Sequence, residues 1–156
     1  MVWTHCRCIL MFLAFGSAPV FGADPTKAVE EVLRAYEQAW GSHDGHAVAS
    51  FYFEPAMRIS ATGPVVRPTQ ADQEAFFSGF LAGLVKAGYA RSSLEELQVR
   101  LLDPQTAIAS GVTVRSRADG RVFARVGVTY GLRNTPVGWR IFLSATHEPD
   151  SVLRFR

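Results

Sequence analysis

Hydrophobic residues near the start of the chain recur at intervals of three and four, which is the period of an α-helix. The run follows Asp24, Pro25 and Thr26. Proline suits the first helical position, and the side chain of Asp24 or Thr26 can cap the free backbone N–H groups. We therefore expect a first helix that ends at Gly41 and Ser42. Its buried face should comprise Val29, Val32, Leu33, Tyr36, Ala39 and Trp40.

A second, shorter helix is predicted directly after the first. The side chain of Ser42 or Asp44 can cap its start. Glu54-Pro55 ends it, because the residue before a proline disfavours the helical conformation. Its members should include His46, Ala47, Val48, Phe51 and Tyr52.

A third helix is expected to begin at Pro68-Thr69 and to end at Gly88. Two short strands, Met57–Ser60 and Val65–Arg67, should precede it on either side of a turn. The hydrophobic residues of the third helix again follow helical spacing and comprise Phe76, Phe77, Phe80, Leu81, Leu84 and Val85.

From Ser92 onward, apolar and polar residues alternate with a period of two, which indicates β-strands. Residues typical of turns, such as Asp119-Gly120, separate the alternating runs. Four strands are predicted, over residues 94–101, 106–117, 122–133 and 139–147. Helices followed by antiparallel strands predict an α+β fold, in which the N-terminal helices cover one face of a curved antiparallel sheet. Such a sheet encloses an apolar interior that often contains a pocket.

The alternation also assigns strand side chains to the two faces of the sheet. In the last strand, Trp139, Ile141, Leu143 and His147 share the phase that should face the helices. Tyr130 belongs to the inward phase of the preceding strand. The opposite, outward phase contains Phe123, Thr129, Phe142 and Ser144. Because semi-apolar faces of this kind often mediate association, we expect a twofold homodimer through these four residues.

The first 23 residues have the layout of a cleavable signal peptide. Arg7 provides a positive charge, a short apolar run follows, and small residues precede Asp24. The apolar run is shorter than the roughly 20 residues of a membrane span. We expect residues 1–23 to be removed, residues 24–148 to form one domain, and residues 149–156 to form a C-terminal tail. The mature protein should be periplasmic or secreted.

Composition excludes several classes of partner and chemistry. The formal net charge of the 156-residue chain is +2, which gives no reason to expect a nucleic acid or a membrane surface as partner. Both cysteines, Cys6 and Cys8, lie in the predicted signal peptide, so the mature chain has no thiol for a disulfide, a metal or a nucleophile. No phosphate-binding loop or dinucleotide fingerprint occurs, and we expect no cofactor.

The order of these elements, with several short motifs, resembles the nuclear transport factor 2-like superfamily. The motifs are Tyr36-x-x-x-Trp40, Asp44 at the start of the second helix, Phe51-Tyr52 with Pro55, and Gly138-Trp139-Arg140-Ile141. They cover residues 26–148. The resemblance implies a cone-shaped α+β barrel, as in ketosteroid isomerases and SnoaL-type polyketide cyclases. This fold serves enzymes, ligand binders and association domains, so it does not identify a reaction.

The resemblance allows the ketosteroid isomerase mechanism to be tested residue by residue. That family uses a tyrosine donor, a carboxylate base and a protonated carboxylic acid donor. Tyr36 falls at the tyrosine position, but the other two positions fall near Ser60 and Val128. A serine cannot remove a carbon-bound proton unaided, because the pKa of its hydroxyl is far above neutral. No Asp or Glu lies between Glu54 and Asp72, so we expect no activity of the isomerase type.

The candidate ligand-binding residues are those expected to point into the cone: Tyr36, Trp40, Tyr52, Tyr130 and His147. They would form a mostly apolar pocket with a few polar groups, which suits a small apolar or aromatic ligand. His147 or Tyr36 could serve in catalysis, since histidine titrates near neutral pH. Alternatively, His147 lies at the end of its strand in contact with water. A cavity below about 100 Å³ would exclude a drug-sized ligand.

No metal site is expected. His43 and His46 flank Asp44, but they lie on either side of a helix start, and a zinc site needs three or four convergent ligands. Arg58 could meet an acidic ligand at the mouth of the cone. Otherwise Arg58, Arg91 and Arg125 are most simply solvated charges.

Three functions remain open from the sequence. The first is an exported binder of a small apolar or aromatic ligand. The second is a SnoaL-like cyclase, isomerase or lyase that uses His147 with Tyr36 or Tyr52. The third is a non-catalytic homodimeric association module. The lack of a carboxylate base at the expected positions favours the first or third function over an enzyme.

Overall fold

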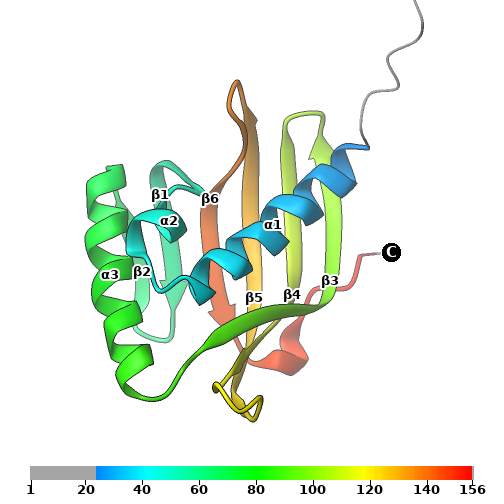
Figure 1. Cartoon of the computed structure of the whole chain (residues 1–156). Helices are drawn as coiled ribbons and strands as arrows, with labels where there is room; N and C mark the ends of the chain where they lie inside the picture. Colours follow the sequence, from blue (N-terminus) through cyan, green and yellow to red (C-terminus); the bar gives the residue numbers. More distant parts are fainter. Residues whose placement is uncertain (1–23, 156) are drawn as a thin grey trace, which may run out of the picture.

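The computed structural model describes residues 24–155 and shows helices packed on one face of a curved sheet (Figure 1). The predicted α+β architecture is confirmed. The predicted signal peptide, residues 1–23, lies outside the described residues. Within the described part of the chain, no helix has the length and hydrophobicity needed to cross a membrane.

The sheet of the described chain contains six strands in the order β2-β1-β6-β5-β4-β3. Strands β1 and β6 are parallel, and all other neighbours are antiparallel. The two short strands predicted before the third helix and the four long strands are all present. Their bounds are β1 Tyr52–Ser60, β2 Gly63–Arg67, β3 Arg91–Asp103, β4 Thr106–Ser116, β5 Val122–Thr135 and β6 Gly138–His147.

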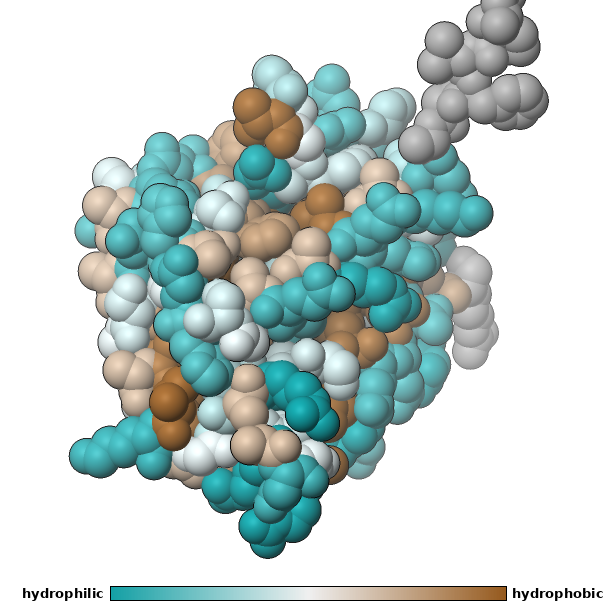
Figure 2. Space-filling view, in the orientation of Figure 1, coloured by the Kyte–Doolittle hydropathy of each residue, from teal (hydrophilic) through white to brown (hydrophobic). Residues whose placement is uncertain are grey.

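The first helix, α1 (Pro25–Gly41), crosses the sheet diagonally in front of the long strands (Figure 1). The Asp24 carboxylate caps it by accepting a hydrogen bond from the Thr26 backbone N–H at 2.9 Å, as predicted. Val29, Leu33, Tyr36 and Trp40 are buried on its inner face, again as predicted. The exposed side of the helices is largely hydrophilic, with smaller hydrophobic patches (Figure 2).

The second helix, α2 (Gly45–Ala49), is shorter than predicted. Phe51 and Tyr52 were expected in this helix, but Tyr52 begins β1 instead. The reason is pairing with the sheet, since the Ile141 N–H donates a hydrogen bond to the Phe51 carbonyl at 2.9 Å. The tertiary contact therefore overrides the local helical spacing.

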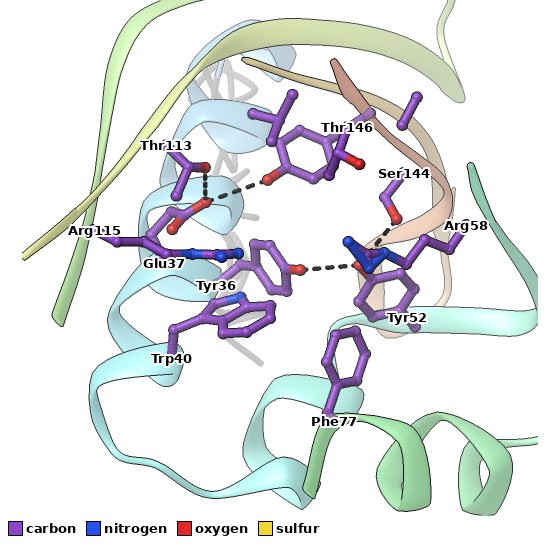
Figure 3. Close-up of a pocket in the computed structure, with 13 residues that line it drawn as sticks. Tyr36, Glu37, Trp40, Tyr52, Arg58, Phe77, Thr113, Arg115, Ser144 and Thr146 are labelled. Carbon is purple, nitrogen blue, oxygen red and sulfur yellow. Dashed lines mark hydrogen bonds between the residues drawn. The ribbon is translucent and has the colours of Figure 1, made fainter. Parts of the chain in front are cut away.

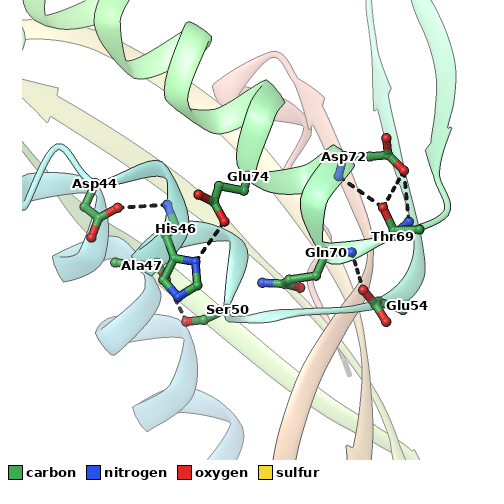
Figure 4. A network of polar contacts seen from close by, with 9 residues as sticks. All are labelled: Asp44, His46, Ala47, Ser50, Glu54, Thr69, Gln70, Asp72 and Glu74. Carbon is green, nitrogen blue, oxygen red and sulfur yellow. Dashed lines mark hydrogen bonds and ion pairs between the residues drawn. The ribbon is translucent and has the colours of Figure 1, made fainter.

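The third helix, α3 (Gln70–Lys86), lies beside β1 and β2 and is fixed at its start by a capping box. The Thr69 hydroxyl accepts from the Asp72 N–H, and the Asp72 carboxylate accepts from the Thr69 N–H (Figure 4). The Glu54 carboxylate accepts a further hydrogen bond from the Gln70 N–H. At the other end of the network, His46 on α2 contacts Glu74 on α3 at 2.8 Å. These contacts tie both helices to β1.

An extra residue in β6 changes which side chains face the helices. Leu132 of β5 pairs with Ile141, but its neighbour Gly131 pairs with Leu143, so Phe142 forms a β-bulge. An extra residue shifts the alternation by one position, and every later side chain changes face. The inward phase predicted for Trp139 and Ile141 is correct. Beyond the bulge, the predicted phase is wrong.

The C-terminal tail packs against the outer face of the sheet. It forms a short 3₁₀ helix, η1 (Pro149–Ser151), next to β5. The Leu153 N–H donates a hydrogen bond to the Ser110 hydroxyl at 3.1 Å, and Arg154 pairs with Glu96 at 2.7 Å. The tail therefore covers part of the surface that the sequence assigned to a dimer contact.

The contact between α2 and α3 generates a prediction about two glycines. A Cβ atom added at Gly45 would lie 2.5 Å from the Ser78 nitrogen and 2.8 Å from its Cα, whereas a Cβ at Gly79 would meet no atom within 4 Å. Gly45→Ala should lower the free energy of unfolding by about 1–3 kcal/mol, because backbone atoms must move apart. Gly79→Ala should raise it by about 0.5–1 kcal/mol through helix propensity. Urea unfolding measures both, and equal effects would contradict the close packing.

Candidate functional site

A pocket opens between the helices and the inner face of the sheet. The space in it that can hold water-sized groups is about 30 Å³, and all the empty space between its walls, with the open solvent at its mouth, is about 380 Å³. The enclosed part has room for roughly two water molecules. It falls below the threshold of about 100 Å³, so the interior does not admit a drug-sized ligand. The walls are Tyr36, Glu37, Trp40, Tyr52, Arg58, Phe77, Thr113, Arg115, Val128, Tyr130, Ser144, Ala145 and Thr146.

Aromatic rings fill most of the cone. The Tyr36 ring, on α1, makes edge contacts with Trp40 at 6.0 Å and with Phe51, Tyr52 and Tyr130 at 5.8 Å between ring centroids. The Tyr36 and Tyr52 hydroxyls are hydrogen-bonded at 2.9 Å, and Tyr52 donates to the Ser144 hydroxyl at 3.3 Å (Figure 3). Packing of this kind fixes the hydroxyl groups in position.

A carboxylate lies inside this aromatic shell. Glu37, on the buried face of α1, is only 3% exposed. Its Oε1 atom accepts a hydrogen bond from the Thr113 hydroxyl at 2.8 Å (Figure 3). The same atom accepts a second hydrogen bond from the Tyr130 hydroxyl at 3.2 Å. Both donors belong to the sheet. The carboxylate therefore joins α1 to β4 and β5 across the interior of the cone.

Burial changes the acidity of these groups. Desolvation raises the pKa of Glu37 to about 7, although the hydrogen bonds from Thr113 and Tyr130 and the positive charge of Arg115 oppose the shift. Burial also raises the pKa of Tyr36, Tyr52 and Tyr130 above the ordinary value for tyrosine. The tyrosine hydroxyls thus keep their protons near neutral pH, while Glu37 exchanges between its two protonation states.

Two arginines line the pocket as well. Arg58 comes from β1 and Arg115 from β4, and they reach toward the tyrosines from opposite sides (Figure 3). The Arg115 guanidinium lies 5.4 Å from the centroid of the Trp40 ring, within range of a cation–π contact. The pocket thus combines positive charge, tyrosine hydroxyls and one carboxylate that titrates near neutral pH.

The structure brings together four of the five residues predicted to bind a ligand. Tyr36, Trp40, Tyr52 and Tyr130 all line the pocket. The fifth, His147, does not, because the bulge at Phe142 turns it to the outer face. Binding of a ligand by the four remains a prediction.

His147 takes part in a hydrogen-bond network on the outer face. Its Nε2 atom lies 3.0 Å from the Thr129 hydroxyl, which is itself 2.9 Å from the Ser110 hydroxyl. Ser110 also accepts from Leu153 in the tail. The histidine therefore supports the tail contact and lies away from the pocket, so its predicted position inside the cone is wrong, while a catalytic role for His147 stays an untested prediction.

Sequence reasoning missed Glu37, although its position carried a signal. Glu37 is four residues after Leu33 and three before Trp40, so it lies on the same helical face as the predicted core. It also directly follows Tyr36. The two positions at which the isomerase resemblance implied a carboxyl group hold Ser60 and Val128. Ser60 hydrogen-bonds Thr62, and Val128 lines the pocket. Glu37 supplies a carboxylate from a different position.

The four residues predicted to form a dimer contact do not all lie on the outer face of the sheet. Ser144 is buried in the pocket and does not face outward, because it follows the bulge. Phe123 lies at a register shift in β5 and packs against the core, with the Arg117 guanidinium 4.9 Å from its ring centroid. Thr129 and Phe142 do lie on the outer face. There, Phe142 borders an apolar groove with Pro55, Ala56, Met57, Val66 and Leu143.

No group of three or more His, Cys, Asp or Glu side chains within residues 24–155 is arranged to hold a metal ion. The His43 Nε2 atom contacts the Ala90 carbonyl at 3.1 Å, and His46 pairs with Glu74. Hydrogen bonding to Glu74 raises the pKa of His46, which lies on the surface. The two histidines therefore point to different partners.

Comparisons with known proteins agree with this architecture. The family model described as NTF2-like protein (DUF6841) matches residues 26–149. An NTF2-like protein with a cystatin-like fold from Novosphingobium aromaticivorans has 19% identity and a TM-score of 0.64, covering 80% of this chain and 82% of its own. An NTF2-like protein of unknown function from Shewanella oneidensis also has 19% identity and a TM-score of 0.64, covering 79% and 98%.

A domain of unknown function with a cystatin-like fold from Nostoc punctiforme has 20% identity and a TM-score of 0.64, covering 78% of this chain and 75% of its own. No curated protein matches the sequence. At these identities, the similarity establishes the fold and leaves the function to be argued from the site.

The burial of Glu37 predicts how stability depends on pH. The pKa of this residue is about 7 in the folded chain and 4.5 for an ordinary glutamic acid. The folded state therefore binds more protons between these values, and the free energy of unfolding falls as the pH rises through them. Across this pH range, the titration of Glu37 should lower the free energy of unfolding by about 3 kcal/mol. Glutamine does not titrate, so Glu37→Gln should lack this decrease.

Urea unfolding of the wild type and Glu37→Gln, near pH 5 and near pH 8, measures the effect. Glu31→Gln is a matched control, because Glu31 is exposed on the same helix. As the pH rises, the free energy of unfolding of Glu37→Gln should increase relative to that of the wild type. The value for Glu31→Gln should follow the wild type. Parallel pH profiles for all three proteins would show that Glu37 has an ordinary acidity.

Proposed function

The chain belongs to the NTF2-like protein family DUF6841, and from this premise we propose that its interior pocket is an acid–base site for a small ligand. Glu37 accepts or returns the proton, and the tyrosine hydroxyls bind the ligand's polar group. The observation that supports this function best is a carboxylate with a pKa of about 7 that lines the pocket.

An acid–base catalyst works best when its pKa lies near the working pH, because both protonation states are then populated. An exposed glutamate would be almost fully ionised at neutral pH, and its carboxylate would be a weak base. Burial of Glu37 beside Tyr36, Tyr52 and Tyr130 brings its pKa to the useful range. Perturbed acidity inside a pocket is typical of functional sites, which supports an enzyme over a filled association domain.

The reaction that these groups support is proton abstraction next to a carbonyl. The C–H bond breaks and its proton passes to a Glu37 carboxylate oxygen. The C–H electron pair forms a C=C bond, and the π pair of the carbonyl moves onto the carbonyl oxygen. A tyrosine hydroxyl, which stays protonated, stabilises that oxygen by donating a hydrogen bond. Returning the proton to the same or a neighbouring carbon completes an exchange or an isomerisation. Glu37 would thus act as the carboxylate base that is absent from the positions implied by the isomerase resemblance.

The pocket dimensions support a ligand of few heavy atoms. Only about 30 Å³ of the pocket can hold water-sized groups, and the total empty space of about 380 Å³ includes open solvent at the mouth. A small carbonyl group can occupy the enclosed part while the rest of the molecule lies in the mouth. This proposal replaces the apolar or aromatic ligand expected from the sequence with a smaller and more polar one.

A homodimer remains a second proposal, and the apolar groove beside Phe142 supports it. Met57 and Val66 are 36% and 53% exposed there, next to Leu143. Exposed apolar patches of this kind often mediate association. Export through residues 1–23 also remains a prediction.

Proton transfer can be measured as deuterium uptake from D₂O. Pyruvate and its neutral amide, pyruvamide, both carry a methyl group beside a carbonyl, and ¹H NMR follows the loss of its signal. The wild type should accelerate exchange of at least one of the two, with a rate that rises to a plateau around the pKa of Glu37, about 7. Glu37→Gln should reduce the acceleration roughly 10²–10⁴-fold, the usual contribution of a general base.

Glu31→Gln again provides the control, since Glu31 lies on the exposed side of α1. It should exchange both compounds at the wild-type rate. Two results would contradict an acid–base role for this pocket. One is deuterium exchange that Glu37→Gln accelerates as much as the wild type does, and the other is a wild type that accelerates exchange of neither compound.

Light scattering tests the proposed dimer. The protein from residue 24 onward should have the mass of two chains at tens of micromolar, and Val66→Lys should shift it to one chain by placing a charge in the groove. Val137→Lys is the matched control, because Val137 is 72% exposed in the turn between β5 and β6. A monomeric wild type, or a dimer unaffected by Val66→Lys, would contradict this interface.

A further inference from the structure

Three arginines cluster around two stacked phenylalanines of α3, and two of the three line the pocket. The Phe76 and Phe80 rings are stacked with centroids 5.6 Å apart. The Arg67 guanidinium lies 3.7 Å from the Phe76 centroid, and that of Arg58 lies 5.4 Å from both rings. Arg115 lies 5.6 Å from the Phe80 centroid. Because they share these two rings, Arg58, Arg67 and Arg115 form one arginine cluster.

The arginine cluster has no acidic partner within residues 24–155. The ion pairs of this part of the chain involve other residues. The Arg67 Nη1 and Arg115 Nε atoms are buried and have no hydrogen-bond acceptor among the residues that the structure describes. Contacts with the aromatic faces stabilise the positive charges only in part, because they leave the N–H groups unsatisfied.

Two carboxylates act on these arginines through their charge, and both accept hydrogen bonds from other groups. Asp72 accepts hydrogen bonds from Thr69 in the cap of α3. Glu37 accepts from Thr113 and Tyr130, and Arg115 affects it only through its charge. A buried donor without an acceptor is uncommon in folded proteins and requires an explanation. A negatively charged group supplied by a ligand would offset these charges and accept hydrogen bonds from N–H groups of the arginines that line the pocket.

We propose that the arginine cluster binds the carboxylate of a small organic acid, whose remaining atoms enter the pocket. The inference rests on the proposed function, since it names the substrate class of the same site. Guanidinium groups match the geometry of a carboxylate, to which they donate two parallel hydrogen bonds. A monoanion suits the site better than a doubly charged phosphate, because Glu37 below it carries negative charge when ionised.

Arg58 and Arg115 both line the pocket that contains Glu37. A carboxylate held between them would therefore direct its neighbouring carbon toward the tyrosines and Glu37. The arginine cluster would both select anionic substrates and orient them, as positioning residues commonly do in enzymes. In this arrangement, a neutral analogue of the substrate should bind more weakly but should still be able to react.

Propionate and its neutral amide, propionamide, test the proposal, since they differ chiefly in charge. Titration of the ¹⁵N-labelled protein, followed by NMR, should show propionate binding at least about tenfold more tightly than propionamide. Arg58→Gln and Arg115→Gln should each weaken propionate binding about tenfold or more and leave propionamide almost unchanged. Arg121→Gln should have no effect, because Arg121 is exposed and paired with Asp119.

The NMR spectra also report whether each variant is folded. Arg115→Lys serves where Arg115→Gln does not fold, because lysine keeps the charge but lacks the paired donors. The proposal is overturned when propionate binds no more tightly than propionamide, when neither binds up to about 50 mM, or when the folded Arg58 and Arg115 variants bind propionate like the wild type.

The Glu37→Gln variant separates this proposal from the proposed function. It should bind propionate at least as tightly as the wild type, because it removes a negative charge near the arginine cluster. Propionate binding without deuterium exchange in the wild type would reject proton transfer and keep the carboxylate site. Exchange of pyruvamide without any preference for propionate would reject the carboxylate site and keep proton transfer.

Discussion

The burial of the Glu37 carboxylate is the constraint on which the rest of the site depends. A carboxyl group that is 3% exposed must be hydrogen-bonded, and Thr113 and Tyr130 supply the two donors from neighbouring strands. These bonds hold α1 against the sheet at a fixed rotation. That rotation presents Tyr36 and Trp40 to the interior, so the aromatic shell and the acidity of Glu37 have the same structural origin.

Much of the fold follows from local patterns in the sequence. The helical spacing of Val29, Leu33 and Trp40 predicted α1 and its buried face, and the alternation after Ser92 predicted the long strands. Tyr36, Tyr52 and Tyr130 were expected in the interior and are found there. Tyr52 arrives from a strand and not from the predicted helix, because pairing with β6 outweighs its helical spacing.

The face of the last part of β6 could not be predicted, because a single bulge at Phe142 reverses it. The bulge reflects pairing with β5 and leaves no mark in the alternation itself. It moves His147 out of the pocket and Ser144 into it. Glu37 was missed for another reason: an acidic residue on a helix is ordinarily assigned to solvent, and its spacing from Leu33 was the signal that indicated burial.

Three features converge on one pocket: a carboxylate of raised pKa, tyrosines that stay protonated, and arginines that lack an acidic partner in the described part of the chain. Each is common alone, and their convergence supports proton transfer on a small anionic substrate. The acidity of Glu37 is tested most directly by a ¹³C NMR titration of its side-chain carboxyl carbon, assigned by comparison with Glu37→Gln. The account predicts a midpoint of about 7, and a midpoint at the ordinary value of 4.5 would contradict it.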